Sequence, residues 1–312
     1  MTRIVLLVVA TTAAAVLSVS PPFTPAATPA RELAFSRGEG SASEIYVIRE
    51  DRTGLRRLTT NRFSDYSPIW SPDGNRILFV SNRDGDDELF VMDANGKGIR
   101  QLTRNRRLDL TPQWSPDGSL IAFASDRGRV GEPEIWIMRS DGTRARRLIR
   151  TVNHRTWQDL QYSPTWSSDG KRIAFSMAAS ESNPELYSVG LTGRGLRRLT
   201  RTAGSAALFG DDTMPDWSND GRTILFVSNR DRVSSDVWVM SANGAGQRTL
   251  VRRPRSDDWH PRLSPDGQTV TFTERPLPAG AAWVALMAAD GSSLKRLTRG
   301  SEGDWRPPVS KG

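Results

Sequence analysis

The chain has 312 residues, of which 37% are hydrophobic and 25% are charged, and its formal net charge is +8. This is the balance of an ordinary globular protein, and the length is enough for one large all-β domain. Cysteine is absent, which excludes a disulfide framework, a thiolate nucleophile and a cysteine-ligated metal.

Residues 1–30 have the features of a secretory signal peptide. Arg3 supplies a positive charge, and the apolar run from Ile4 to Val19 leads into serine, proline, threonine and alanine. An uncleaved anchor is the alternative, but a run of about 16 residues is short of the roughly 20 that a spanning helix needs. We expect cleavage near Ala27 or Ala30. The mature protein is then secreted or periplasmic and has no transmembrane span.

A repeated pattern fills the remainder, residues 31–312. Four copies carry Trp-Ser-x-Asp-Gly, and a fifth keeps all of it but the tryptophan. These copies are Trp70–Gly74, Trp114–Gly118, Trp166–Gly170, Trp217–Gly221 and Leu263–Gly267. Their Asp-Gly pairs recur every 44 to 52 residues. A period of about 40–50 residues made of short strands is typical of a β-propeller, so the chain is predicted to be all-β.

Each copy contains four short apolar segments separated by turn signals, as a four-stranded blade requires. In the copy beginning at Pro68, the first strand ends at Ser71, the second covers Ile77 to Ser81 and the third covers Leu89 to Met92. The fourth ends near Leu102. Six copies of the second, third and fourth strands are present, which predicts six blades.

The first strand of the N-terminal blade is missing ahead of Leu33. Pro307 to Ser310 aligns with Pro68 to Ser71, so we expect this C-terminal segment to pair with Leu33 to Ser36. Such pairing closes the ring and removes the open sheet edges that a linear array exposes.

The pattern Pro-x-Trp-Ser-Pro-Asp-Gly, followed by Ile-Ala-Phe, Ile-Trp-Ile-Met and Arg-Leu-Thr, resembles the WD40-like PD40 repeat of TolB-type six-bladed propellers. The resemblance covers essentially all of residues 31–312. It implies a propeller fold without the N-terminal α/β domain of TolB, because the first blade follows the signal directly. The same repeat resembles propellers attached to prolyl-oligopeptidase-type hydrolases.

An acid stands three residues before the repeat proline in most copies. With one glutamine, these residues are Asp65, Asp109, Gln161, Asp212, Asp258 and Asp304. One hypothesis places them around one mouth of the central channel, as a ring that would suit Ca²⁺ or Mg²⁺. The alternative is structural: each acid serves its own blade by bonding backbone N–H groups or pairing with Arg83, Arg127 or Arg230.

Two consecutive connections break the repeat. Ile149 to Pro164 and Thr200 to Pro215 each span fifteen steps, against nine or ten elsewhere. They carry a group of aromatic and charged residues, His154, Arg155, Trp157, Tyr162, Phe209 and Asp211. Face loops on a rigid scaffold commonly form binding sites, so we predict a site for a protein or glycan ligand there. Alternatively, the aromatic rings fill small cores beneath their own loops.

No catalytic residue is assigned. The two histidines, His154 and His260, are too few for a three-histidine zinc site, and no Gly-x-Ser-x-Gly elbow is present. We therefore expect a monomeric, non-enzymatic binding or scaffold module of the cell envelope that has no cofactor, unless Ca²⁺ occupies the channel mouth. The alternative is a glycan hydrolase or lyase that uses the channel-mouth carboxylates with a divalent ion. Nucleic acid is not expected as a partner, because basic residues are spread over every blade.

Overall fold

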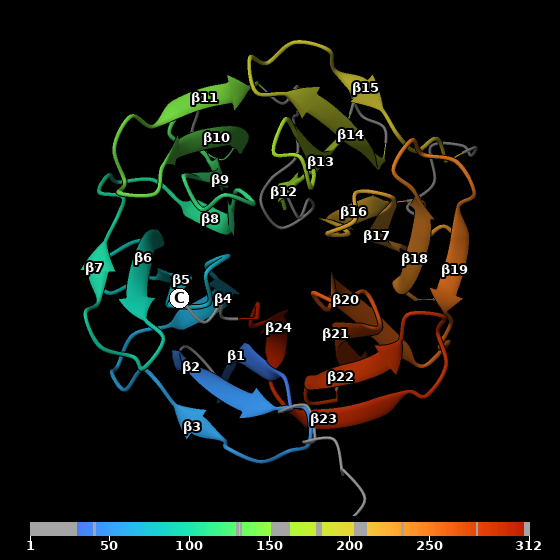
Figure 1. Cartoon of the computed structure of the whole chain (residues 1–312), viewed down its shortest axis with the longest axis horizontal. Coiled ribbons are helices and arrows are strands. Elements are labelled where there is room, and N and C mark those ends of the chain that lie inside the picture. The colour runs from blue at the N-terminus through green and yellow to red at the C-terminus, as the bar shows by residue number, and fades with distance from the viewer. Residues whose placement is uncertain are drawn as a thin grey trace, which may run out of the picture.

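The computed structural model describes residues 30–39, 42–128, 131, 133–150, 163–178, 183–202, 211–231, 234–278 and 280–308. Six four-stranded antiparallel sheets surround a central channel (Figure 1). This confirms the predicted all-β, six-bladed propeller. Within these residues no helix is long and apolar enough to cross a membrane.

Each blade is one sheet whose strands run in order from the channel outward. Blade 1 comprises β24 (Ser301–Trp305), β1 (Glu32–Glu39), β2 (Ala42–Arg49) and β3 (Arg56–Arg57). Blade 2 comprises β4 (Asp65–Trp70), β5 (Arg76–Ser81), β6 (Glu88–Asp93) and β7 (Arg100–Gln101). Blade 3 comprises β8 (Asp109–Trp114), β9 (Leu120–Ser125), β10 (Glu134–Arg139) and β11 (Arg146–Ile149).

The second half of the ring repeats this order. Blade 4 comprises β12 (Thr165–Trp166), β13 (Arg172–Ala178), β14 (Pro184–Gly190) and β15 (Arg197–Arg198). Blade 5 comprises β16 (Asp212–Trp217), β17 (Thr223–Ser228), β18 (Asp236–Ser241) and β19 (Arg248–Val251). Blade 6 comprises β20 (Ser256–Leu263), β21 (Thr269–Pro276), β22 (Trp283–Ala288) and β23 (Lys295–Arg299).

The hydrophobic core lies between neighbouring blades. One phenylalanine in the second strand of every blade is fully buried: Phe35, Phe79, Phe123, Phe175, Phe226 and Phe272. The repeat tryptophan at the end of the innermost strand joins the same layer. Trp70, for example, packs with Ala34 and Ile45 of blade 1 and with Ile77 of its own blade. The repeated residues therefore hold one blade against the next.

The Asp-Gly turns have the conformation that the sequence predicts. Gly74 has a φ of 67°, a region that glycine enters without steric cost. Asp73 supports this turn by accepting hydrogen bonds from the Ser71 hydroxyl at 2.5 Å and from the Asn75 N–H at 3.1 Å. The turns therefore place the residues after each tryptophan at one end of the channel.

The C-terminal strand closes the ring, but at a different register from the one expected. β24 covers Ser301–Trp305 and pairs Trp305 with Leu33, as β4 pairs Trp70 with Ile77. The predicted closing segment began at Pro307. It was aligned on the wrong proline: Pro307 stands two residues after a tryptophan and therefore matches Pro72, and residues 309–312 lie outside the described part of the chain.

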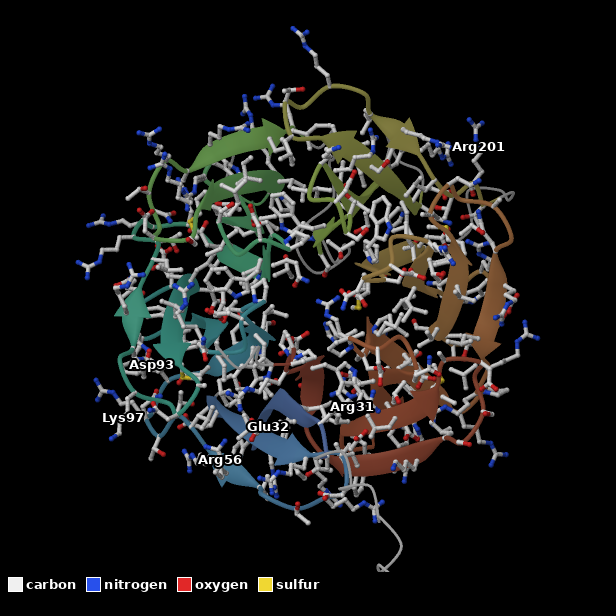
Figure 2. All side chains as sticks on the ribbon, in the orientation of Figure 1. Arg31, Glu32, Arg56, Asp93, Lys97 and Arg201 are labelled. Carbon is white, nitrogen blue, oxygen red and sulfur yellow. The ribbon has the colours of Figure 1, made fainter. Side chains whose placement is uncertain are left out.

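Polar contacts reinforce this closure beside β1. The backbone N–H of Arg306 donates to the carbonyl oxygen of Glu32 at 2.9 Å, and the two side chains form an ion pair at 3.0 Å. Arg31 bridges Glu50 of blade 1 and Asp266 of blade 6, each at 2.7 Å. Figure 2 labels Arg31 and Glu32 at this junction.

The outer rim of the ring is strongly charged. Arg56, Lys97 and Arg201 lie there among many other charged side chains (Figure 2). Their place on or beside the outermost strands suits edge protection, because charged side chains oppose edge-to-edge pairing of strands.

Candidate functional site

Four of the acids expected at the channel mouth are fully buried instead. Their carboxylates are paired with arginines and their side chains are 0% exposed: Asp65 with Arg83, Asp109 with Arg127, Asp212 with Arg230 and Asp258 with Arg253. These contacts match the structural alternative, with Arg253 as a partner that the repeat pattern did not indicate.

The register explains why these carboxylates do not open onto the channel. Asp65 pairs with Ser81 across the sheet, and Arg83, two residues later, reaches back to that position. The Arg83 Nε donates to Ser81 Oγ at 2.9 Å and its Nη2 contacts both Asp65 oxygens at 2.9 Å. Burial raises the pKa of Asp258 to about 6 against the effect of Arg253. The pairs made by Arg83, Arg127 and Arg230 thus each stabilise their own blade, whereas Arg253 reaches Asp258 from the connection between blades 5 and 6.

Asp304 is not a member of that set of acids. Because Trp305 takes the tryptophan position, Asp304 corresponds to Ile69 of blade 2 rather than to Asp65. This corrects the sequence alignment. Gln161 and the loop residues His154, Arg155, Trp157, Tyr162 and Phe209 lie outside the described residues. Asp211 is described, and its N–H donates to Asn229 Oδ1 at 2.7 Å.

The channel holds a cavity of about 360 Å³ at the end that bears the Asp-Gly turns. Its walls combine the repeat tryptophans with the residues two places further on. The latter are Pro72, Pro116, Ser168, Asn219, Pro265 and Pro307. The long connections enter β12 and β16 at the opposite end. The cavity is therefore at the end of the channel opposite to the one where β12 and β16 begin.

One residue from each innermost strand faces this cavity, immediately before the tryptophan position. The six are Ile69, Gln113, Thr165, Asp216, Arg262 and Asp304. Unlike the tryptophans, they are not one residue type. Three consecutive blades supply the charged members, and the other three supply neutral ones. The channel therefore has one charged side and one neutral side.

Arg262 lies between the two carboxylates of this charged side. Its Nη1 is 3.3 Å from Asp216 Oδ1, and its Nε is 4.0 Å from Asp304 Oδ1. Burial raises the pKa of both acids, that of Asp304 to about 7, although Arg262 acts in the opposite direction. At neutral pH this group of three therefore holds the charged guanidinium of Arg262 and the carboxyl group of Asp304, which ionises near neutrality. The third member, Asp216, has a pKa that is raised from its ordinary value.

The same two acids also link neighbouring blades. Asp216 Oδ2 accepts the backbone N–H of Leu263 at 2.9 Å, and Asp304 Oδ2 accepts that of Trp70 at 2.8 Å. Thr165 Oγ1 accepts the N–H of Trp217 at 3.2 Å in the same way. In these three blades, the side chain immediately before the tryptophan position thus accepts the backbone N–H at the tryptophan position of the next blade.

A second, deeper layer follows along the channel. Backbone bulges repeat in the innermost strands, and their residues have positive φ: Ser67, Thr111, Met214, His260 and Glu302, at 49° to 58°. Such bulges redirect a side chain. Here Ser67, Thr111, His260 and Glu302, with Ser163, line a smaller cavity. This layer was not expected from the sequence, because its residues differ from blade to blade.

Glu302 and His260 are the ionisable groups of this layer. Glu302 accepts the N–H of Ser67 at 2.7 Å and its hydroxyl at 3.0 Å. His260 Nε2 lies 3.8 Å from Glu302 Oε1, and its Nδ1 has no partner among the described residues. Burial lowers the pKa of His260, Glu302 opposes this and Arg262 reinforces it. The imidazole is therefore neutral at neutral pH.

Comparison with known proteins identifies the repeat. The model of the TolB beta propeller domain, PD40, matches residues 8–159 and 150–310. The Tol-Pal system protein TolB of Anaeromyxobacter dehalogenans is 35% identical over 100 residues, 32% of this chain and 21% of that protein. The uncharacterized peptidase YuxL of Bacillus subtilis is 30% identical over 118 residues, 37% of this chain and 17% of YuxL. The chain thus spans about a fifth of the length of these relatives.

Among solved structures, TolB from Acinetobacter baumannii superposes with a TM-score of 0.75 at 22% identity. The match covers 89% of this chain and 67% of that one. At this identity the likeness concerns the fold alone, and it agrees with the six blades.

Proposed function

Since the chain belongs to the TolB β-propeller (PD40) family, we propose that it is an exported, non-enzymatic protein-binding module of the cell envelope. Its ligand is a segment of polypeptide that enters the cavity at the Asp-Gly end of the channel. Residues 1–30 act as the signal that carries it out of the cytoplasm.

The shape and lining of the cavity support this proposal most directly. A hollow of about 360 Å³ falls within the size range of ligand pockets and would take a few side chains of an inserted segment. Aromatic and arginine side chains dominate the energetics of protein interfaces, and here tryptophan and proline surround Arg262 and its two acids. The apolar wall would stabilise a buried apolar side chain of the ligand. The polar floor would distinguish one ligand sequence from another.

The charged floor favours binding over catalysis. One carboxylate oxygen of Asp216 and one of Asp304 accept a hydrogen bond from a backbone N–H of the next blade. The scaffold therefore fixes the position of both side chains. The four buried acids that the alternative glycan hydrolase or lyase would use, from Asp65 to Asp258, are paired with arginines. The two carboxylates that do face a common cavity, Asp216 and Asp304, lie on either side of the Arg262 guanidinium.

The two long connections remain a proposed second contact surface. We propose that His154, Trp157 and Phe209, which lie outside the described residues, contact the same protein ligand. A protein ligand that reaches both ends would explain why blades 4 and 5 alone depart from the common loop length.

A variant that fills the cavity tests the proposal. Asn219 is exposed and lines the cavity, so Asn219→Arg should obstruct the mouth without disturbing the core. Asn75→Arg is the matched control, because Asn75 is exposed outside the lining and its counterparts in other copies are Lys171 and Arg222. In pull-downs from envelope extract, we expect Asn219→Arg to lose about tenfold of the captured protein and Asn75→Arg to keep it. Equal capture by both variants would remove the cavity from the proposal.

A further inference from the structure

An arginine lies over the repeat tryptophan at three successive junctions between blades: 6 and 1, 1 and 2, and 2 and 3. The distances from the arginine Cζ to the centre of the ring are 4.7 Å for Arg31 and Trp305, 4.8 Å for Arg306 and Trp70, and 5.0 Å for Arg76 and Trp114. A guanidinium within about 6 Å of an indole ring is attracted to the face of that ring. Each of these junctions therefore holds a cation against its tryptophan.

A carboxylate of the preceding blade accompanies each of these guanidinium groups. The pairs are Asp266 with Arg31 at 2.7 Å, Glu32 with Arg306 at 3.0 Å, and Asp73 with Arg76, which interact electrostatically. The repeated unit is thus a carboxylate, a guanidinium and an indole, and the guanidinium joins one blade to the next.

The junction between blades 3 and 4 keeps the carboxylate and the indole but has leucine at the position of the arginine. Asp117 is in the Asp-Gly turn of blade 3, and Trp166 ends the innermost strand of blade 4. Leu120 begins β9 as Arg76 begins β5. Leucine is shorter than arginine and carries no charge, so this junction lacks the cation that the three preceding ones have at this position.

A groove of about 400 Å³ lies at this junction. Leu120, Trp166 and Leu191 supply its apolar lining, and Asp117 of blade 3 and Asp169 of blade 4 supply its carboxylates. The arginine side chain carries a charged group on an apolar stem. The groove offers a surface for both parts.

The charge of the groove favours a cationic side chain. The described residues that line it include two carboxylates and no lysine, arginine or histidine. Hydrogen bonds from Ser115 and Ser119 lower the pKa of Asp117, so this carboxylate is ionised at neutral pH. Arg139, which pairs with Leu120 across the sheet, interacts electrostatically with Asp141 of its own turn.

The two remaining junctions depart from the repeated unit in another way. The Trp217 indole N–H donates to the carbonyl oxygen of Gly221 in its own turn at 3.2 Å. Leu263 stands where blade 6 would have its tryptophan. Among the described residues, a turn carboxylate and a repeat tryptophan with leucine at the arginine position therefore occur together only between blades 3 and 4.

We propose that an arginine side chain of the polypeptide ligand lies in this groove, with its guanidinium beside Asp117 and its methylene groups on Leu120. The groove shares Pro116, Trp166 and Ser168 with the channel cavity, so a segment that enters the cavity reaches the groove directly, and the assignment rests on the proposed function. Arginine suits the site better than lysine, because its planar guanidinium both stacks on aromatic rings and pairs with carboxylates. The ligand then supplies the cation that the chain itself supplies at the three preceding junctions.

Nuclear magnetic resonance of the protein labelled with ¹⁵N in its tryptophans tests the groove. The indole N–H of Trp166 donates to the Gln113 carbonyl oxygen at 3.1 Å and reports on binding. We expect N-acetyl-arginine amide to shift this resonance, and its neutral isostere N-acetyl-citrulline amide to bind about tenfold more weakly. Asp117→Asn should weaken the arginine amide to a similar degree. Asp220→Asn, at the same turn position of blade 5, is the matched control and should leave the response unchanged.

Two exchanges between blades 2 and 3 provide the second test. Leu120→Arg introduces the arginine of blade 2 and should abolish the Trp166 response, and blades 2 and 4 already hold arginine at this position. Arg76→Leu should create a second response, at the indole of Trp114. The proposal would be overturned by a Trp166 resonance that does not move, by equal responses to the two amides, or by a response that persists unchanged in Leu120→Arg.

Pull-downs from envelope extract separate this proposal from the proposed function. We expect Leu120→Arg and Asn219→Arg each to lose captured protein. If Asn219→Arg lost it and Leu120→Arg kept all of it, the cavity would bind protein without an arginine in the groove, and only the groove assignment would fail. If both variants kept all of it, the proposed function itself would fail.

Discussion

The Asp304 carboxylate accepts the backbone N–H of Trp70 at 2.8 Å, although 234 residues separate them. This bond links β24, the last strand, to β4, the innermost strand of the next blade. It stands at the point where the ring closes. Asp304 also faces Arg262 across the channel floor, so one side chain belongs both to the closure and to the proposed binding cavity.

Stability should therefore depend on the ionisation of Asp304. Its folded pKa is raised to about 7 from the ordinary value of 3.8, so the folded state holds the proton more tightly than the unfolded state. The resulting stabilisation is complete below the unfolded pKa and is lost as pH rises through the folded pKa. We expect the ionisation of Asp304 to lower the free energy of unfolding of the wild type by about 2–4 kcal/mol as the pH rises from 4 to 8.

Urea unfolding of Asp304→Asn at both pH values measures this contribution. The asparagine oxygen can still accept the Trp70 N–H but cannot ionise, so the difference between variant and wild type should change by that amount with pH. A difference that stays constant across the range would show that Asp304 has the same pKa in the folded and unfolded states, and the folded pKa would then not be raised.

Ring closure by Ser301–Trp305 predicts the outcome of two truncations. A chain ending at Pro308 retains β24 and should unfold at the wild-type temperature. A chain ending at Gly300 loses Trp305, which is 4% exposed, and leaves an open edge on β1, so it should be insoluble or melt well below the wild type. Thermal unfolding by circular dichroism distinguishes them. If both chains lost stability equally, residues 309–312 would be needed for closure.

The buried pair of Asp65 and Arg83 should matter far more than a pair on the rim. Asp65 is fully buried, so Arg83→Ala leaves an uncompensated carboxylate and should cost about 3–5 kcal/mol. Arg56 pairs with Glu32 while 47% exposed, and Arg56→Ala should cost no more than about 1 kcal/mol. Chemical denaturation of the two variants gives the comparison. Similar losses of unfolding free energy in the two variants would mean that the buried pair contributes no more to stability than the exposed one.

Much of the architecture was predictable because it is repeated. Tryptophans such as Trp70 end the innermost strand in five of the six blades, and Asp-Gly turns such as Asp73-Gly74 join the first two strands in five, since neighbouring blades need the same interface and the same turn. The copies therefore reveal blade number and strand order. The closing strand was misplaced because Pro307 follows Trp305 where the alignment needed a proline before the tryptophan.

The channel layers were not predictable in the same way. Ile69, Gln113 and Arg262 occupy one structural position but share no residue type, so no repeated signature marks them. Alignment on the residue before each tryptophan would have found the position, though not the bulges that turn Glu302 and His260 inward. Conversely, Asp65 and Asp212 occupy a repeated position because each pairs with an arginine of its own blade. At that position the repetition indicates a structural role and not a binding role.

The most direct test of the binding proposal is site-specific photo-crosslinking in the envelope. A photoreactive residue at Ser168 would stand in the cavity wall, and one at Asn75 would stand outside it. We predict that position 168 yields a discrete protein adduct and position 75 yields none. Adducts of the same kind from both positions, or an adduct from position 75 alone, would contradict the assignment of the cavity as the protein-binding site.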